Sequence, residues 1–347
     1  MGARELLGRQ VTLTRPVGVA PGELQKKPAA RTRVRELLTH QVTGPLAALL
    51  VAIIIFSATT DTFLSAGNWS LIAQQSVVVG TLALGQTLII LTAGIDLAIG
   101  AIMVMGAVVI GKYALEGNPV VALLLGLVVC VAFGALNGVL VSLAGLPPFI
   151  VTLGLFTAVT AAARLYSSSA SFPIADGVLT VLGDGPSIGG VQITYGVMLW
   201  VAMTFVLGYV LSSTAWGTRL YAVGDNPRAA ELSGIKVKRM LLTVYIVAAV
   251  IYAIAAWQSL GRTPTADPSG YATANLDSIT AVAIGGTSFF GGRGGVWGTL
   301  VGTLIVVVLQ NGLTQAGIDS LYQEVTTGAL VVVAVGLDRI MHKRQER

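Results

Sequence analysis

The sequence predicts an all-α membrane protein, a polytopic bundle of about ten transmembrane helices with both termini in the cytoplasm. Of its 347 residues, 54% are hydrophobic and 11% are charged, whereas a soluble domain carries about 25% charged residues. Apolar runs follow one another so closely that no water-soluble core has room between them. The 42 glycines suit helices that pack closely in lipid, where small residues let backbones approach.

Ten apolar runs are long enough, or nearly so, to cross the hydrocarbon core, which takes about 20 residues of helix. We expect helices at residues 43–60, 69–92, 97–113, 119–144, 149–165, 195–213, 241–260, 277–291, 295–313 and 321–337. The third run would be only about 26 Å long at 1.5 Å per residue, against a core of about 30 Å. A broken or re-entrant passage is expected there.

The basic residues separate to one side of the membrane when the chain crosses ten times. Eight lie before the first run, five in the loop 214–240, one (Arg293) between the eighth and ninth runs and four in the tail 339–347, while the outer side keeps Lys112, Arg164 and Arg262. The positive-inside rule then places both termini in the cytoplasm. We expect a basic, flexible arm at 1–41, a transmembrane domain at 42–338 and a cytoplasmic tail at 339–347.

Residues for catalysis or metal binding are missing from the apolar runs. His40 and His342 lie in the charged tails, and Cys130 is the only cysteine, so an intramembrane hydrolase lacks an evident base and a metal site lacks ligands. Residues 106–113 fit a phosphate-binding loop except that Tyr113 replaces the Ser or Thr that would hold magnesium. We expect no metal, no cofactor, no nucleotide hydrolysis by this chain and no nucleic-acid partner.

Asp96 is the only acidic residue close to the middle of a long apolar region. An ionisable group in such a place is a candidate proton or ion site. A structural explanation is favoured, because Gly94 can break one helix and the Asp96 carboxylate can cap the next by accepting its free N–H groups. An ion-coupled carrier would need several paired charges inside the spans.

Uncharged amides also lie on the predicted spans: Gln74, Gln75, Gln86, Asn137, Gln310 and Asn311. They can bond between helices, which is the expected role of most of them, or line a water-filled path. A path of amides and hydroxyls suits a neutral, hydroxyl-rich solute, because it exchanges hydrogen bonds without desolvating ions. The candidates for such a path or for the helix break are Gly94, Asp96, Gln74, Gln86, Asn137 and Asn311.

The inner loop at 214–240 contains the signals of a short surface helix. Pro227 suits the first turn, Asp225 or Asn226 suits the cap, and Gly234 suits the end. A helix of two turns can dock into a partner, or it can be an amphipathic surface helix without a partner. These residues alone leave both interpretations open.

Four stretches, in this order, resemble the ribose-type permeases of bacterial ATP-binding-cassette importers. They are residues 91–100 (LTAGIDLAIG), 222–235 (AVGDNPRAAELSGI), 284–295 (IGGTSFFGGRGG) and 298–305 (GTLVGTLI). Their order and spacing matter more than any single motif, and the resemblance runs from about residue 45 to 337. It implies a permease in the bacterial inner (cytoplasmic) membrane that moves a monosaccharide into the cell by alternating access.

The resemblance also implies the partners and the coupling element. In that family the loop matching residues 224–235 sits in a groove of a separate ATPase subunit. The matching positions here are Asp225, Asn226, Pro227, Ala229, Ala230, Glu231 and Gly234. A second permease chain, identical or related, and a periplasmic or lipid-anchored substrate-binding protein would complete the importer.

One departure from the family pattern lies before the eighth span. Family members commonly read Gly-Tyr-Glu-Leu-Asp before the eighth span, whereas residues 270–277 of this chain read GYATANLD and lack the Glu. Any role of that acid is therefore in doubt here. The alternatives to a sugar are branched-chain amino acids or nucleosides, carried by a related permease.

Overall fold

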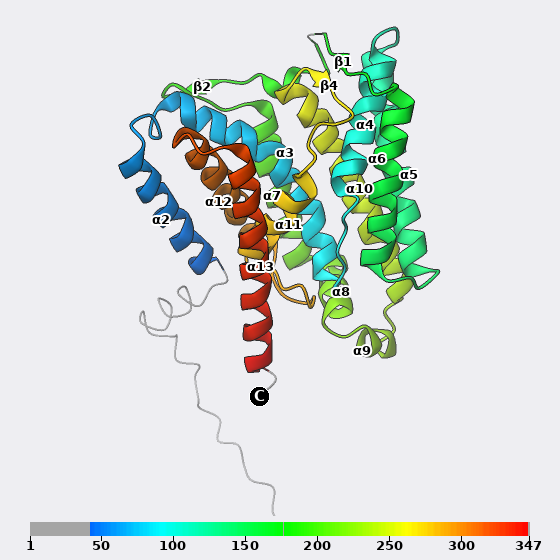
Figure 1. Ribbon diagram of the computed structural model, residues 1–347. Coiled ribbons are helices and arrows are strands. Elements are labelled where there is room, and N and C mark those ends of the chain that lie inside the picture. Colours follow the sequence, from blue (N-terminus) through cyan, green and yellow to red (C-terminus); the bar gives the residue numbers. More distant parts are fainter. Residues whose placement is uncertain (1–41, 176, 346–347) are drawn as a thin grey trace, which may run out of the picture. The chain divides into compact units, whose positions relative to one another are not determined.

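The computed structural model describes residues 42–175 and 177–345, which form a bundle of helices (Figure 1). The predicted arm at 1–41 lies outside the described residues. Within them, six helices are long and apolar enough to cross a membrane. These are α3 (Ala66–Leu91), α5 (Pro119–Ser142), α6 (Pro148–Ser167), α7 (Tyr195–Ser213), α10 (Val237–Arg262) and α12 (Val296–Gln315). The prediction of an all-α, multi-pass membrane protein is confirmed at this level.

Four further helices occupy the other predicted runs. Three are shorter and apolar: α2 (Thr43–Thr59), α4 (Ile99–Ala114) and α11 (Ala274–Ile284). The fourth, α13 (Ser320–Gln345), ends the described chain. The number of crossings and the side on which the termini lie stay predictions.

The run at 277–291 was predicted wrongly as one helix. Helix α11 ends at Ile284, and Gly286 and Gly291 both adopt φ of +82°. Such left-handed backbone is open to glycine at no steric cost and ends a helix. The eleven residues of α11 are too few to span a hydrocarbon core alone, because a spanning helix needs about 20.

Helix α3 is the central element of the bundle. It packs against α7, α10, α11 and α12, and 83% of its most apolar window is buried, compared with 22% for α5 and for α6. The exposed faces of α5 and α6 are apolar, which suits a lipid environment. Close packing uses glycine: a β-carbon on Gly134 of α5 would overlap that of Ala249 on α10.

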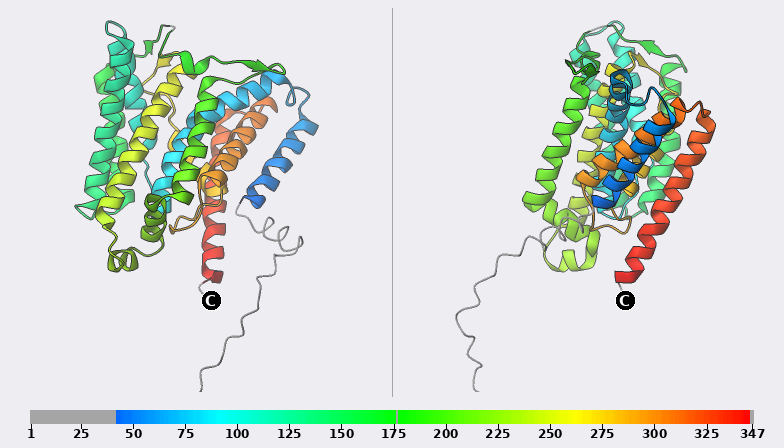
Figure 2. Two further views of the ribbon diagram at one scale, coloured as in Figure 1. Left: turned by 180° about the vertical axis from the view of Figure 1, so that it is seen from behind. Right: turned by 90° about the vertical axis from the view of Figure 1, so that its left-hand side faces the viewer.

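The two ends of the bundle differ (Figures 1 and 2). One end carries two short antiparallel strand pairs and the 3₁₀ turn η1 (Val181–Gly183): β1 (Phe172–Pro173) pairs with β4 (Thr265–Ala266), and β2 (Ser187–Ile188) forms a hairpin with β3 (Val191–Gln192). The other end carries α8 (Ala215–Asp225), α9 (Pro227–Leu232) and the last turns of α13.

Candidate functional site

The predicted surface helix is present as α9. It begins at Pro227, and its cap is Asn226 rather than Asp225, since the Asn226 side-chain oxygen accepts a hydrogen bond from the Ala229 N–H at 3.0 Å. Gly234 follows with φ of +84°. Of the residues predicted for coupling, Ala230 is buried against the bundle and the others are exposed. The helix therefore presents an open surface fixed by one buried residue.

Helix α8 ends in a junction of three backbone segments just before α9. The glycine-rich loop is the segment 285–295 between α11 and α12, and the N–H of its Gly292 donates to the carbonyl of Leu91 at the end of α3 (3.0 Å). A β-carbon on Gly224 of α8 would overlap that same carbonyl oxygen and lie 2.7 Å from the Gly292 nitrogen. One on Gly291 would lie 2.6 Å from the Gly224 oxygen and 3.0 Å from the Ala93 β-carbon. The end of α3, the end of α8 and the glycine-rich loop therefore contact one another through main-chain atoms.

A side-chain bond and a second glycine contact extend this junction. The Tyr221 hydroxyl of α8 donates to the carbonyl of Gly294 at 2.8 Å, and burial raises the pKa of Tyr221, which keeps it a donor. Gly285, at the end of α11, lies so close to Gly298 of α12 that a β-carbon on either would meet the other's backbone. The structure thus brings together all four stretches that carry the family resemblance.

Helix α3 ends in a Schellman motif just before Gly94, the residue expected to break the helix, and the left-handed residue of the motif is Ala93. Ala93 has φ of +59°; its N–H donates to Ile90 (2.8 Å), and the Gly94 N–H donates to Ile89 (3.1 Å). Glycine at Ala93 would remove a cost of about 1 kcal/mol. The Ala93 methyl instead faces Gly291 across the junction.

Asp96 lies in the non-helical segment between α3 and α4, and it is buried. Its Oδ1 accepts from the Ala98 N–H at 2.8 Å and its Oδ2 from the Tyr252 hydroxyl at 3.3 Å. The side-chain amide of Gln86 makes two hydrogen bonds to the Asp96 backbone in the orientation that satisfies its nitrogen and its oxygen. It donates to the Asp96 carbonyl (3.1 Å) and accepts from the Asp96 N–H (3.3 Å). These bonds hold Asp96 as a buried structural group of the helix break, although the N–H from which it accepts belongs to Ala98, one residue before α4 begins.

A pair of substitutions separates the cap from an ion site. Asp96→Asn keeps an oxygen for the Ala98 N–H, so we expect abundance and uptake within about twofold of the wild type. Asp96→Ala orphans two donors and should lower the free energy of unfolding by about 1–3 kcal/mol. Thermal unfolding in detergent and uptake in cells measure both. Loss of uptake in a stably folded Asp96→Asn variant would instead indicate that the charge itself is used.

The other predicted path residues lie in different parts of the bundle. Gln74 lies near the hairpin end, 3.4 Å from Gln192 of β3. Asn137 of α5 is fully buried, and neither atom of its amide has a hydrogen-bond partner among the described residues. Asn311 of α12 is buried with its Oδ1 in the same condition. Their part in a solute path stays a prediction.

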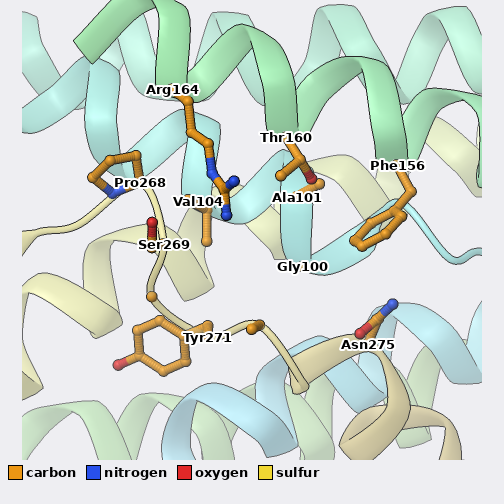
Figure 3. A pocket seen from close by; sticks show the side chains of 12 residues that line it. Gly100, Ala101, Val104, Phe156, Thr160, Arg164, Pro268, Ser269, Tyr271 and Asn275 are labelled. Atoms are coloured by element: carbon orange, nitrogen blue, oxygen red, sulfur yellow. The ribbon is translucent and has the colours of Figure 1, made fainter. Parts of the chain in front are cut away.

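A cavity of about 130 Å³, whose mostly apolar lining includes a few polar side chains, lies between α4, α6 and the segment that leads into α11 (Figure 3). Its lining consists of Gly100, Ala101, Val104, Phe156, Thr160, Arg164, Pro268, Ser269, Gly270, Tyr271, Ala272 and Asn275. None of these was singled out as a path residue from the sequence. Arg164 was read only as an outer charge; the departure from the family pattern at 270–277 was the one signal that pointed to Asn275.

Interrupted helices inside an apolar bundle, a cavity beside them and a capped surface helix at one end are the features of a multi-pass membrane permease. Comparison with known sequences identifies the family of this permease. The chain belongs to the family of branched-chain amino acid transport system permease components, whose model matches residues 68–335.

Several relatives carry sugar names. The chain is 42% identical over 307 residues to the fructose import permease of Rhizobium meliloti, which covers 86% of this chain and 85% of the relative. It is 35% identical to the ribose import permease of Bacillus subtilis (86% and 93%) and to the D-allose transport system permease of Escherichia coli (86% and 92%). No solved structure matches the chain significantly.

Proposed function

We propose that this chain is the membrane-spanning subunit of an ATP-driven importer that moves a monosaccharide across the bacterial inner membrane. The observation that carries the proposal is the 42% identity to a fructose import permease along nearly the whole membrane domain. Ribose and allose permeases match over a similar length. The neutral, hydroxyl-rich character of these three sugars agrees with a bundle whose described spans bury amides and hydroxyls and few charges.

The energy for transport comes from separate ATPase subunits that contact α9. The positive-inside rule assigns α8 and α9 to the cytoplasm, where ATP is available. A second permease chain completes the path, and a substrate-binding protein delivers the sugar at the hairpin end. ATP binding and release shift the permease between outward-facing and inward-facing states, because the ATPase contacts these two states differently.

The junction supports a route for that shift. Movement of α9 reaches α8 directly, and Gly224 of α8 contacts the end of α3 and the glycine-rich loop. From there it passes to the break at Asp96 and to α11 and α12. Backbone contacts suit this task because a main chain cannot yield by a change of rotamer, as a side chain does.

The test is uptake in the source bacterium. Labelled fructose, ribose, allose, branched-chain amino acids and nucleosides are offered to cells with the gene intact, deleted, or restored as wild type, Glu231→Arg or Glu231→Asp. We expect one sugar to fail in the deletion strain. Wild type and Glu231→Asp should restore it, and Glu231→Arg, a charge reversal on the exposed face of α9, should reduce it at least tenfold.

Two outcomes contradict parts of this proposal. If an amino acid or a nucleoside fails to enter and every sugar enters normally, the sugar assignment is wrong while the permease class stands. If Glu231→Arg restores full uptake at normal membrane abundance, α9 is not the coupling element. Immunoblots of the membrane fraction supply the abundance.

A further inference from the structure

The cavity of Figure 3 lies where two interrupted helices begin. Helix α4 starts at Ile99 after the break, and α11 starts at Ala274 after a non-helical segment. First-turn residues of both, Gly100 and Asn275, line the cavity. Helix N-termini carry partial positive charge and unpaired N–H groups, and interrupted helices of this kind commonly form solute sites in transporters.

Arg164 supplies the charge of the cavity. It projects from the last turn of α6 into the cavity, between Val104 and Thr160 in the view of Figure 3. It is the only charged residue among the twelve that line this cavity. No ion pair joins it to a carboxylate in the described part of the chain. Arg164 is exposed, so its guanidinium donors are open to water and to the hydroxyl or carboxylate oxygens of a solute.

Asn275 faces Arg164 from the other wall. The side chain is 8% exposed, and its Nδ2 donates to the Leu97 carbonyl in the helix break at 3.4 Å. No described hydrogen bond engages its Oδ1, and the residue lines the cavity (Figure 3).

The surroundings favour a sugar ring over an elongated solute. Phe156 offers an apolar ring face on the α6 wall, next to Thr160. Aromatic faces pack against the C–H face of a sugar while polar groups at the rim bind its hydroxyls. Tyr271, on the opposite wall, is held at φ of +55°, and such strain in a non-glycine residue is typical of functional sites.

A second cavity, of about 370 Å³, adjoins the first. It shares Val104, Gly270 and Tyr271 with it and also contains Asp267. The Oδ1 of Asp267 accepts from the Ser269 N–H at 2.8 Å, so one face of that carboxylate is engaged by its own loop. Both cavities lie along α4: the first reaches Asn275 and the second reaches Thr265 of β4.

We propose that the first cavity is a solute-contact site of the permease, in which Arg164 and Asn275 bind the oxygens of a neutral or anionic monosaccharide. This inference rests on the proposed function and adds the site and its charge preference. The uncompensated Arg164 favours neutral and anionic solutes over cationic amino sugars. Asn275 preserves that preference, because a Glu in its place would face Arg164 and cancel its charge.

The test uses the single cysteine of the chain. Cys130 is fully buried in α5, so a cysteine placed in the cavity is the main target for water-soluble thiol reagents. Thr160→Cys lies one turn from Arg164 on the same face of α6. The complete importer is reconstituted in liposomes and treated from the hairpin side with a sulfonate-bearing or a trimethylammonium-bearing methanethiosulfonate. Ser187→Cys, on the exposed β2 strand outside the cavity lining, is the control.

We expect Thr160→Cys to react with both reagents. After correction for the intrinsic reactivity of each reagent, the anionic reagent should modify Thr160→Cys faster than it modifies Ser187→Cys. Adding Arg164→Gln or Asn275→Glu should lower the anionic-to-cationic ratio of rates by about threefold to tenfold, as expected when one nearby charge is removed or cancelled. Modification should block sugar uptake, and D-fructose in excess should slow it. The rates of cysteine modification can be measured without any transport assay.

Three results would overturn the inference. A Thr160→Cys that stays unmodified while Ser187→Cys reacts fully would mean that lipid or another chain fills the cavity. If neither Arg164→Gln nor Asn275→Glu changes the anionic-to-cationic ratio of modification rates, the charge of Arg164 does not act in the cavity. Full uptake after complete modification would place the solute elsewhere. If labelling behaves as expected but no sugar depends on the gene, the proposed function fails while the charged, water-filled cavity stands.

Discussion

Gly224→Ala should abolish transport. The added β-carbon would overlap the Leu91 carbonyl oxygen and lie 2.7 Å from the Gly292 nitrogen. Both neighbours are main-chain atoms, so the clash forces α8 away from α3 and the glycine-rich loop. Such overpacking costs about 1–3 kcal/mol of the free energy of unfolding, and it acts where α9 joins the bundle. We expect uptake below about a tenth of the wild type and a lower unfolding temperature in detergent.

Two other glycines give matched controls. A β-carbon on Gly154 of α6 would have nothing within 4 Å, and Gly154→Ala should transport normally with equal or greater stability. Gly234 also has open space but a φ of +84°, so Gly234→Ala measures backbone strain without a clash. Wild-type uptake and stability in Gly224→Ala would show that the junction tolerates separation and does not transmit movement.

Leu232→Asp should uncouple the importer without unfolding it. Leu232 is 91% exposed at the end of α9, so its side chain stabilises little within this chain. An apolar residue at the centre of a contact with the ATPase would contribute at least about 2 kcal/mol to binding. We expect normal membrane abundance and unfolding temperature, with loss of both sugar uptake and the ATPase stimulation caused by the loaded binding protein.

Leu232→Met is the control, because it keeps an apolar side chain of similar volume. It should retain most uptake. If Leu232→Asp transports as well as Leu232→Met, the ATPase does not contact this end of α9. The assignment would then move to the face that carries Glu231.

The helices could be predicted from the sequence because lipid leaves a spanning chain few alternatives to a helix. Each of the ten apolar runs contains helical structure in the described residues. The error at 277–291 came from hydropathy, which continues past Ile284 although Gly285 and Gly286 end the helix. Hydropathy indicates whether a segment prefers lipid, but it does not indicate the residue at which the backbone leaves the helical conformation.

The site was predictable only in part. Helix α9 could be predicted from Asn226, Pro227 and Gly234, because the residues that cap and end a helix are local sequence features. Ala93 could not be identified as the left-handed residue, since Gly94 beside it is the better candidate by propensity. The cavity and the junction depend on which helices are neighbours, and no local pattern brings Arg164 to Asn275 or Gly224 to Leu91.

The junction at Gly224, Gly292 and Leu91 has a consequence for genetics. A contact between side chains can be lost through one substitution and regained through a compensating one on the partner, which leaves correlated changes between related sequences. Main-chain atoms offer no such partner to alter. Selection for suppressors of Gly224→Ala should therefore return mainly true revertants, and the positions that meet there should vary together less than the side-chain contacts around them.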